Sequence, residues 1–373
     1  MARGRAREAI LDAIRAAEPL SRVEIAGVTG LTEAAVSMTV RRLLDEGLVV
    51  ETGRAPTAGK PRTLLRLDPS ARIAVGVHLD AGTATFVLTG QTGGIISRLA
   101  RPVSTPATAD ELAAGVTVLL AGSGVDAARC LGIGLTGAMD GAGTGGGAGT
   151  THGGGDLGDR LRAATGFTVL VENDATAAAA GEYWVARLGP ERAFAALHLG
   201  SRLGAGIVVG GRVLRGGGFG HVCVRADGPP CGCGSRGCLE AVAGPRTLVA
   251  LARSDAAAAA EAGLEPGSRS VAAGFAAVAR AARAGAPACL ALLEESAAHV
   301  AAAAESVVNL LDLDLVVLTG PGFAAASFVY GPAIQRRIAP ADAKTWHRSV
   351  TVTVSSAAAT ASATGAAAMV LRS

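Results

Sequence analysis

The sequence predicts an α/β protein in two parts, a small N-terminal unit of short helices and a larger body in which strands and helices alternate. Three features lead to this prediction. Apolar residues recur at helical spacing within residues 1–70, β-prone and helical segments alternate from Ala74 onward, and a histidine and several cysteines, among them Cys231, Cys233 and Cys238, gather within residues 221–238. A chain of 373 residues is long enough for two or three domains.

The composition indicates cores built from small aliphatic side chains. Half of the residues are hydrophobic but only 3% are aromatic, and the surplus is alanine and valine. No uninterrupted apolar run reaches the length of a transmembrane helix, and the N-terminus lacks the continuous apolar core of a signal peptide. We therefore expect a cytoplasmic protein with no membrane partner.

The first seventy residues predict three short helices followed by a hairpin. The first helix covers Ala6–Ala17. Ser21 and Glu24 have the spacing of a capping box that opens the second helix, which Gly30 interrupts. Thr32 caps a third helix that runs to Glu46.

The third helix has two different faces. Its apolar residues, Val36, Val40, Leu43 and Leu44, recur at helical spacing and are expected to face inward. The opposite face carries Thr32, Ala35, Ser37, Met38, Arg41 and Arg42. Small polar and basic groups of this kind can enter the major groove of DNA.

A basic hairpin follows the third helix. Two β-prone segments, residues 48–52 and 63–67, flank the run GRAPTAGKPR, which contributes Arg54, Lys60 and Arg62. The pattern is typical of a winged helix-turn-helix. Such a unit can serve protein contacts alone, but the basic wing favours binding to double-stranded DNA, with wing residues reaching the phosphate backbone or a minor groove.

Strands and helices alternate through the rest of the chain, which indicates a two-lobed α/β body. Predicted strands cover residues 73–79, 84–90, 94–103, 130–137, 168–173, 193–200, 204–210, 313–319 and 350–356. Predicted helices lie near residues 109–120, 157–164, from 175 onward, across much of 239–309, and at 365–371. A glycine turn is expected after the strand at 313–319.

His221, Cys231, Cys233 and Cys238 predict a metal site. Three thiolates and one imidazole are the soft donors of a closed tetrahedral Zn²⁺ site, which is usually structural. The alternative is a set of buried or disulfide-bonded cysteines beside an unrelated histidine. Glu240 lies two residues after the last cysteine.

This region and the runs VENDATAAAAGE, LGSRLGAGIVVGG and LTGPG, in this order, resemble the repressor/ORF/kinase (ROK) family. The resemblance spans essentially the whole chain. It implies a two-lobed actin-like sugar-kinase fold, preceded in the regulator branch by a winged helix-turn-helix. The expected domains are a DNA-binding head at 1–70, a first lobe at 71–182 completed by residues about 356–373, and a second lobe with the zinc site at 183–355.

The resemblance implies a catalytic aspartate at Asp174 and a sugar contact at Asn173, although an Asn-Asp pair at this point can also simply cap a helix. Three phosphate-binding turns depart from the kinase pattern. His78 stands in place of an acid, for which a shifted alignment offers Asp80. Arg202 stands in place of a glycine, and Pro321 in place of another. Together these changes argue against ATP use, so Asp174 is expected to be a vestige.

The resemblance also implies that His221 and Glu240 contact a sugar. The acid that precedes this histidine in the family is missing, and Gly218 stands at the matching position. The carbohydrate pocket is therefore expected to be altered, to favour another ligand, or to be lost.

The sequence thus predicts a DNA-binding transcriptional regulator, acting as a repressor, that responds to a sugar or sugar phosphate. A homo-oligomer, dimer or tetramer, is expected because a twofold protein matches a palindromic operator. One alternative is a sugar kinase with an added DNA-binding head. Another is a DNA-binding dimer that senses no ligand.

Overall fold

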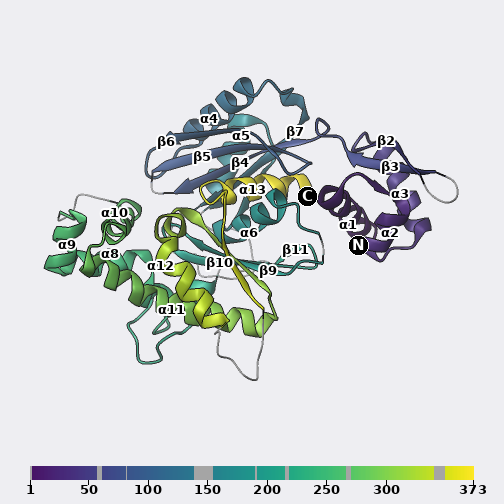
Figure 1. The fold of residues 1–373 in the computed structure, drawn as a ribbon. Coiled ribbons are helices and arrows are strands. Elements are labelled where there is room, and N and C mark those ends of the chain that lie inside the picture. Colours follow the sequence, from purple (N-terminus) through teal and green to yellow (C-terminus); the bar gives the residue numbers. More distant parts are fainter. Residues whose placement is uncertain are drawn as a thin grey trace.

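A computed structural model describes residues 2–56, 61–80, 82–137, 154–189, 191–214, 218–265, 270–339 and 349–373. Figure 1 shows a small N-terminal head beside a body of two lobes, with the C-terminal helix running between the two sheets of the body. The chain is thus an N-terminal winged helix-turn-helix followed by a two-lobed, actin-like α/β fold.

The head contains three helices and a three-stranded sheet of order β1-β3-β2. Its helices are α1 (Ala2–Ala17), α2 (Arg22–Thr29) and α3 (Glu33–Asp45), and its strands are β1 (Leu20–Ser21), β2 (Val49–Ala55) and β3 (Arg62–Leu67). The Ser21 hydroxyl accepts from the Glu24 amide, and the Glu24 carboxylate accepts from the Ser21 amide at 2.7 Å. The predicted capping box is therefore present, and it follows directly on the short strand β1, which the sequence analysis did not predict.

The strands of the wing are longer than expected. Arg54 and Arg62 were predicted to lie in the basic turn, but Arg54 pairs with Thr63 and Ala55 pairs with Arg62 in the β2–β3 ladder. The pairing extends because an antiparallel ladder satisfies the backbone groups of both arms. Both arginines are therefore carried on strands rather than on the connecting loop.

The first lobe is a five-stranded sheet of order β6-β5-β4-β7-β8. Its strands are β4 (Ile73–Asp80), β5 (Thr83–Gly90), β6 (Ile95–Pro102), β7 (Cys130–Gly137) and β8 (Val169–Glu172). One face is covered by α4 (Ala109–Gly122) and α5 (Gly154–Thr165), whose Leu112, Val116 and Leu161 are buried against the sheet.

The second lobe is a five-stranded sheet of order β11-β10-β9-β12-β13 with a helical layer on its outer face. Its strands are β9 (Phe194–Leu199), β10 (Leu203–Val209), β11 (Arg212–Leu214), β12 (Leu315–Thr319) and β13 (Thr351–Val354). Its helices are α7 (Leu239–Ala243), α8 (Pro245–Ser254), α9 (Ala256–Ala262), α10 (Val271–Arg283), α11 (Pro287–Leu311) and α12 (Gly320–Ile338). The predicted glycine turn after β12 is instead the first turn of α12, a 19-residue helix that the sequence analysis missed.

Two helices, α6 (Asp174–Val185) and α13 (Ala361–Arg372), lie between the lobes. They approach closely because their facing residues are small: a Cβ at Gly365 would lie 1.6 Å from the Ala177 carbonyl oxygen. A Cβ at Gly76 of β4 would likewise lie 1.7 Å from the Ala363 carbonyl oxygen. The abundance of alanine and glycine therefore serves close packing between helices and sheet.

Among the described residues, no single helix is long and apolar enough to cross a membrane. By length and composition alone, two bent helix pairs, α2 with α3 and α10 with α11, pass the same test.

Candidate functional site

Helix α3 presents a polar face to solvent. Val36, Val40 and Leu43 are fully buried in the core of the head. On the opposite face Thr32, Ser37, Met38, Arg41 and Arg42 are exposed, and Ala35 is half-buried. Thr32 is also the N-cap, since its hydroxyl accepts from the Ala35 amide at 3.3 Å. The residues expected to meet DNA are therefore accessible together on one surface.

The wing lies beside this helix in the head. Arg54 on β2 and Arg62 on β3 are exposed, and their strands are hydrogen-bonded to each other. Lys60 lies outside the described residues. The two arginines therefore place positive charge on the exposed surface of the hairpin.

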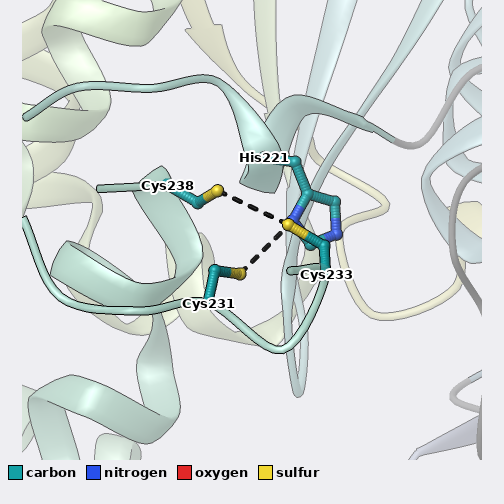
Figure 2. A group of neighbouring side chains, drawn as sticks. All are labelled: His221, Cys231, Cys233 and Cys238. Carbon is teal, nitrogen blue, oxygen red and sulfur yellow. Dashed lines mark hydrogen bonds between the residues drawn. The ribbon is translucent and has the colours of Figure 1, made fainter. Parts of the chain in front are cut away.

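His221, Cys231, Cys233 and Cys238, here called the Cys/His cluster, converge on one point (Figure 2). His221 Nδ1 lies 3.6 Å from Cys231 Sγ, and Cys233 Sγ lies 3.7 Å from Cys238 Sγ. Around a tetrahedral Zn²⁺, ligand distances of about 2.3 Å for sulfur and about 2.1 Å for nitrogen give edges of about 3.8 Å for S···S and about 3.6 Å for N···S. The donor set fits a tetrahedral metal ion without rearrangement of the backbone.

Local turns bring these donors together. The Cys231 amide donates to the Ser235 carbonyl at 2.8 Å. Gly237 has a φ of 63°, and a Cβ there would lie 1.6 Å from the Arg225 carbonyl oxygen. Cys238 is the N-cap of α7.

Burial and the neighbouring thiols raise the pKa of Cys238 to about 11, while the Ser235 backbone contact lowers the pKa of Cys233.

Asn173 and Asp174 begin α6, at the end of β8. The Asn173 Oδ1 accepts from the amides of Ala175 and Thr176 at 3.0 and 3.1 Å, so Asn173 is a genuine N-cap. Asp174 is the first helical residue and is half-buried. The Asn173 cap and the half-buried Asp174 carboxylate thus coexist at this helix terminus.

Glu240 lies close to the same helix terminus. Its Oε2 accepts from the Leu203 amide at 2.8 Å, in the second predicted phosphate turn. Burial raises the pKa of Glu240, and the negative charge of Asp174 adds to the rise. Glu240 also lies against Gly220, the neighbour of His221, since a Cβ at Gly220 would lie 3.4 Å from Glu240 Oε2.

His78, predicted only as a departure from the phosphate pattern, lies close to Asp174. One donor atom each from His78, Asp174 and His198 lies within 4.8 Å of the others, and both histidines are buried. We call these three residues the interlobe cluster, since β4 belongs to the first lobe and β9 to the second. Sequence reasoning missed His198, because nothing local to β9 distinguishes it from a core residue.

The head is fixed to the body by a buried polar network. Asp12 and Arg15 of α1 form a 2.5 Å ion pair, and both side chains are 5% exposed. Arg15 donates to the Gln91 carbonyl at 2.9 Å and stacks over the Trp184 ring at 3.6 Å. Asp12 also pairs with Arg372 at 3.0 Å. Burial lowers the pKa of Arg15, and Asp12 opposes that shift.

A second set of contacts joins the head to the turn between β5 and β6. The Gln91 side-chain amide donates to the carbonyls of Leu48 and Asp68 at 2.9 and 2.6 Å. Arg187, just beyond the end of α6, lies 3.7 Å from Glu18 of the head. The end of α6 that carries Trp184 therefore lies beside the first helix of the head.

Comparisons with known proteins agree with this architecture. Residues 74–373 match the ROK family model, and residues 5–50 match a winged helix-turn-helix DNA-binding model. A crystal structure of a ROK family transcriptional regulator, a homologue of the E. coli Mlc protein, superposes with a TM-score of 0.70 at 21% identity, covering 100% of this chain and 97% of that one. A ROK glucokinase from Streptomyces griseus, in complex with glucose and AMPPNP, gives a TM-score of 0.63 at 26% identity, covering 81% of this chain and 100% of the glucokinase.

Curated relatives include both enzymes and regulators. The glucokinase of Streptomyces coelicolor is 42% identical over 102 residues, which are 26% of this chain and 32% of the enzyme. The xylose repressor of Caldicellulosiruptor bescii is 27% identical over 251 residues, or 62% of each chain. The matches thus span about one third of the glucokinase and less than two thirds of the repressor.

Proposed function

This chain belongs to the ROK family, and from that premise we propose that it is a DNA-binding transcriptional regulator, acting as a repressor, whose body senses a sugar or a sugar phosphate. The observation that carries the proposal is the junction between its two parts. A winged helix-turn-helix head is held against the ROK body by the buried side chains of Asp12 and Arg15 and the half-buried side chain of Arg372. A head anchored in this way can respond to changes in the body.

The DNA partner is a double-stranded operator. The exposed face of α3 supplies Arg41 and Arg42 for base edges or phosphates. Arg54 and Arg62, with Lys60 between them in the sequence, supply positive charge for the phosphate backbone. The similarity to repressors and to a winged helix-turn-helix model supports this assignment.

The effector site is the region around the N-terminus of α6. Asn173 uses its side-chain oxygen for capping, which leaves its amide group to donate to a ligand. The carboxylates of Asp174 and Glu240 are suited to accept hydrogen bonds from sugar hydroxyls. His221, beside Glu240, completes the proposed ligand contacts.

Helix α6 gives a physical route from the effector site to the head. Its first turn holds Asp174, and its last turn holds Tyr183 and Trp184, which contact Asp12 and Arg15. A packed helix moves as a rigid unit, so a shift at Asp174 reaches α1 without an intervening loop. The ligand changes DNA affinity only to the extent that it binds the two arrangements of the head unequally.

The Cys/His cluster is proposed to hold a structural Zn²⁺. All four positions of a tetrahedral ion are filled by protein donors, so the ion has no place for substrate or water. When bound, it fixes His221 and the start of α7. Because Glu240 is the second residue of α7, the ion also fixes the position of that carboxylate.

A sugar kinase is the second candidate. Asp174 stands at the position of the family's catalytic aspartate, and the chain is similar to glucokinases. Three features argue against it: a buried imidazole, His78, faces Asp174; Arg202 occupies the second phosphate turn; and Pro321 occupies the third. We propose that the chain is not an enzyme.

We propose a homodimer as the DNA-binding form, or a tetramer built from it, since regulators that read palindromic sites present two heads. A DNA-binding dimer that senses no ligand remains the third candidate. The proposed domains are a head at 1–70, a first lobe at 71–182 completed by about 356–373, and a second lobe at 183–355.

The regulator proposal is tested by selecting bound sequences from a random DNA duplex library and measuring their affinity by fluorescence anisotropy. A regulator enriches a defined site and binds it at least about a thousandfold more tightly than random DNA. The Arg41→Ala, Arg42→Ala double variant serves as the matched control. Enrichment of no site, or binding that the double variant leaves unchanged, would overturn the DNA-binding assignment.

A further inference from the structure

We propose that the interlobe cluster, His78, Asp174 and His198, is a second metal site that binds a divalent transition-metal ion between the two lobes. This site is separate from the Cys/His cluster and shares no residue with it. Two imidazoles and one carboxylate form a donor set of intermediate softness, which suits Zn²⁺, Co²⁺, Fe²⁺ or Ni²⁺ better than Ca²⁺ or Mg²⁺.

Three chain segments far apart in the sequence converge on this point. His78 lies near the end of β4, Asp174 is the first residue of α6, and His198 lies near the end of β9. Their donor atoms lie within 4.8 Å of one another. The two imidazole rings meet edge to face with their centres 6.0 Å apart.

The ring separation is close to that of two histidines sharing one ion. With nitrogen about 2.1 Å from a tetrahedral ion, two bound imidazole rings have their centres about 5 Å apart. Rotation of the two side chains can supply the difference, since a donor atom of each ring already lies within 4.8 Å of the other. The two imidazoles are therefore close to a binding arrangement.

The hydrogen bonds of His198 leave one ring nitrogen ready to bind a metal. The Thr319 hydroxyl donates to the Leu197 carbonyl at 3.2 Å, so its oxygen accepts from His198 Nδ1, 3.1 Å away. This arrangement favours the tautomer in which His198 Nδ1 carries the proton and Nε2 holds a lone pair. A histidine that binds a metal through one nitrogen and donates from the other to a fixed acceptor is the usual arrangement at metal sites.

Unsatisfied polar atoms supply an independent indication of a missing partner. Within the described part of the chain, four buried side-chain polar atoms have no hydrogen-bond partner: His198 Nε2, Asp80 Oδ1, Thr136 Oγ1 and Thr364 Oγ1. His198 is only 1% exposed. Burial of a polar group without a partner is costly, and a bound ion or water is a common reason for such a group.

Two of the other unsatisfied atoms belong to neighbours of the interlobe cluster. Thr136 pairs with His78 in the β4–β7 ladder. A Cβ at Gly200 would lie 3.1 Å from His198 Nε2 and 3.9 Å from Asp80 Oδ2, so Asp80 and His198 border the same space. Asp80 can therefore act as a fourth ligand or accept a hydrogen bond from a metal-bound water.

The ion would join both sheets and the start of α6. β4 belongs to the first sheet and β9 to the second, so shared coordination by His78 and His198 holds the lobes at a fixed separation. Coordination of Asp174 fixes the same helix terminus that the regulator proposal assigns to the effector. The metal proposal depends on neither DNA binding nor sugar binding, so its test is separate from that of the regulator proposal.

The test is a Co²⁺ titration of the full-length, metal-depleted protein, followed by absorption spectroscopy and equilibrium dialysis. Thiolate-to-Co²⁺ charge-transfer bands report the Cys/His cluster, whereas a site of histidine and carboxylate ligands gives only weak d–d absorption. We expect two ions per chain, only one of which produces charge-transfer bands.

Variants assign the second ion. His198→Gln and His78→Gln should each bind one ion and keep the full charge-transfer bands, which also report that the second lobe is folded. His299→Gln on α11, outside both clusters, is the matched control and should bind two ions. One ion in the wild-type protein, or two ions in both His198→Gln and His78→Gln, would overturn the proposal. If one of these variants does not fold, Asp174→Asn takes its place.

Discussion

Asp12 in the first helix and Arg372 in the last helix form an ion pair of 3.0 Å. The pair joins the head of the chain to its final residues, since α13 packs between the two lobes and ends beside α1 (Figure 1). The Asp12 carboxylate also forms an ion pair with Arg15, whose guanidinium stacks on the Trp184 ring. The head is therefore anchored to the helices that run between the lobes, rather than attached by a linker alone.

Replacing Asp12 with alanine should destabilise the chain strongly, because it leaves the buried guanidinium of Arg15 without its carboxylate. Removing one partner of a buried pair typically costs about 3–5 kcal/mol. Glu46→Ala is the control, since it breaks the more exposed pair with Arg7 and should cost at most about 1 kcal/mol. Urea unfolding of both variants compares these costs, and equal losses would contradict the anchoring role of Asp12.

The wing should contribute charge rather than sequence specificity. Arg62→Ala and Lys60→Ala should each weaken operator binding and random-DNA binding alike, because phosphate contacts carry little sequence information. Each should also reduce the slope of log affinity against log salt by about 1. Arg98→Ala on the body strand β6 is the control. An unchanged slope in both wing variants would remove the wing from the DNA interface.

The Cys/His cluster should account for one tightly bound zinc ion. Cys231→Ser and Cys233→Ser should each lose about one zinc per chain, measured by elemental analysis, and melt at a lower temperature. Cys223→Ser is the matched control, because Cys223 is exposed nearby but is not one of the four converging donors. Zinc content that is equal in all three variants would refute the assignment.

The chain should not phosphorylate sugars. Incubation with ATP, Mg²⁺ and glucose, xylose or N-acetylmannosamine should give no product above that of the Asp174→Ala variant. A ROK glucokinase measured in parallel shows that the assay works. Sustained phosphorylation that disappears in Asp174→Ala would instead make the chain a kinase with an added DNA-binding head.

Local sequence patterns predicted much of the fold. Ser21, Glu24 and Thr32 cap the helices at the expected places, because capping depends on residues only three positions apart. The four donors of the Cys/His cluster were recognisable for the same reason, since they lie within residues 221–238. Elements defined by a few residues were missed: β1 has two residues and β11 has three, too few for any periodic pattern.

Long-range features could not be predicted. His78 and His198 lie on strands of different sheets, and only the packing of the lobes brings both to Asp174. Similarly, Asp12 and Arg15 were expected on an ordinary amphipathic helix, and nothing near them in the sequence indicates Arg372 or Trp184 as partners. The sequence therefore predicted the individual elements of the regulator better than the long-range contacts between them.

Ligand binding in the body should change the DNA affinity of the head. The most direct measurement is operator affinity with and without a sugar that raises the melting temperature of the protein, chosen from glucose, xylose, N-acetylmannosamine and their phosphates. We expect a change of about tenfold or more, equivalent to about 1.4 kcal/mol of coupling, and loss of this change in Asp174→Ala. A sugar that stabilises the protein but leaves operator affinity unaltered, or a panel in which no sugar binds, would contradict it.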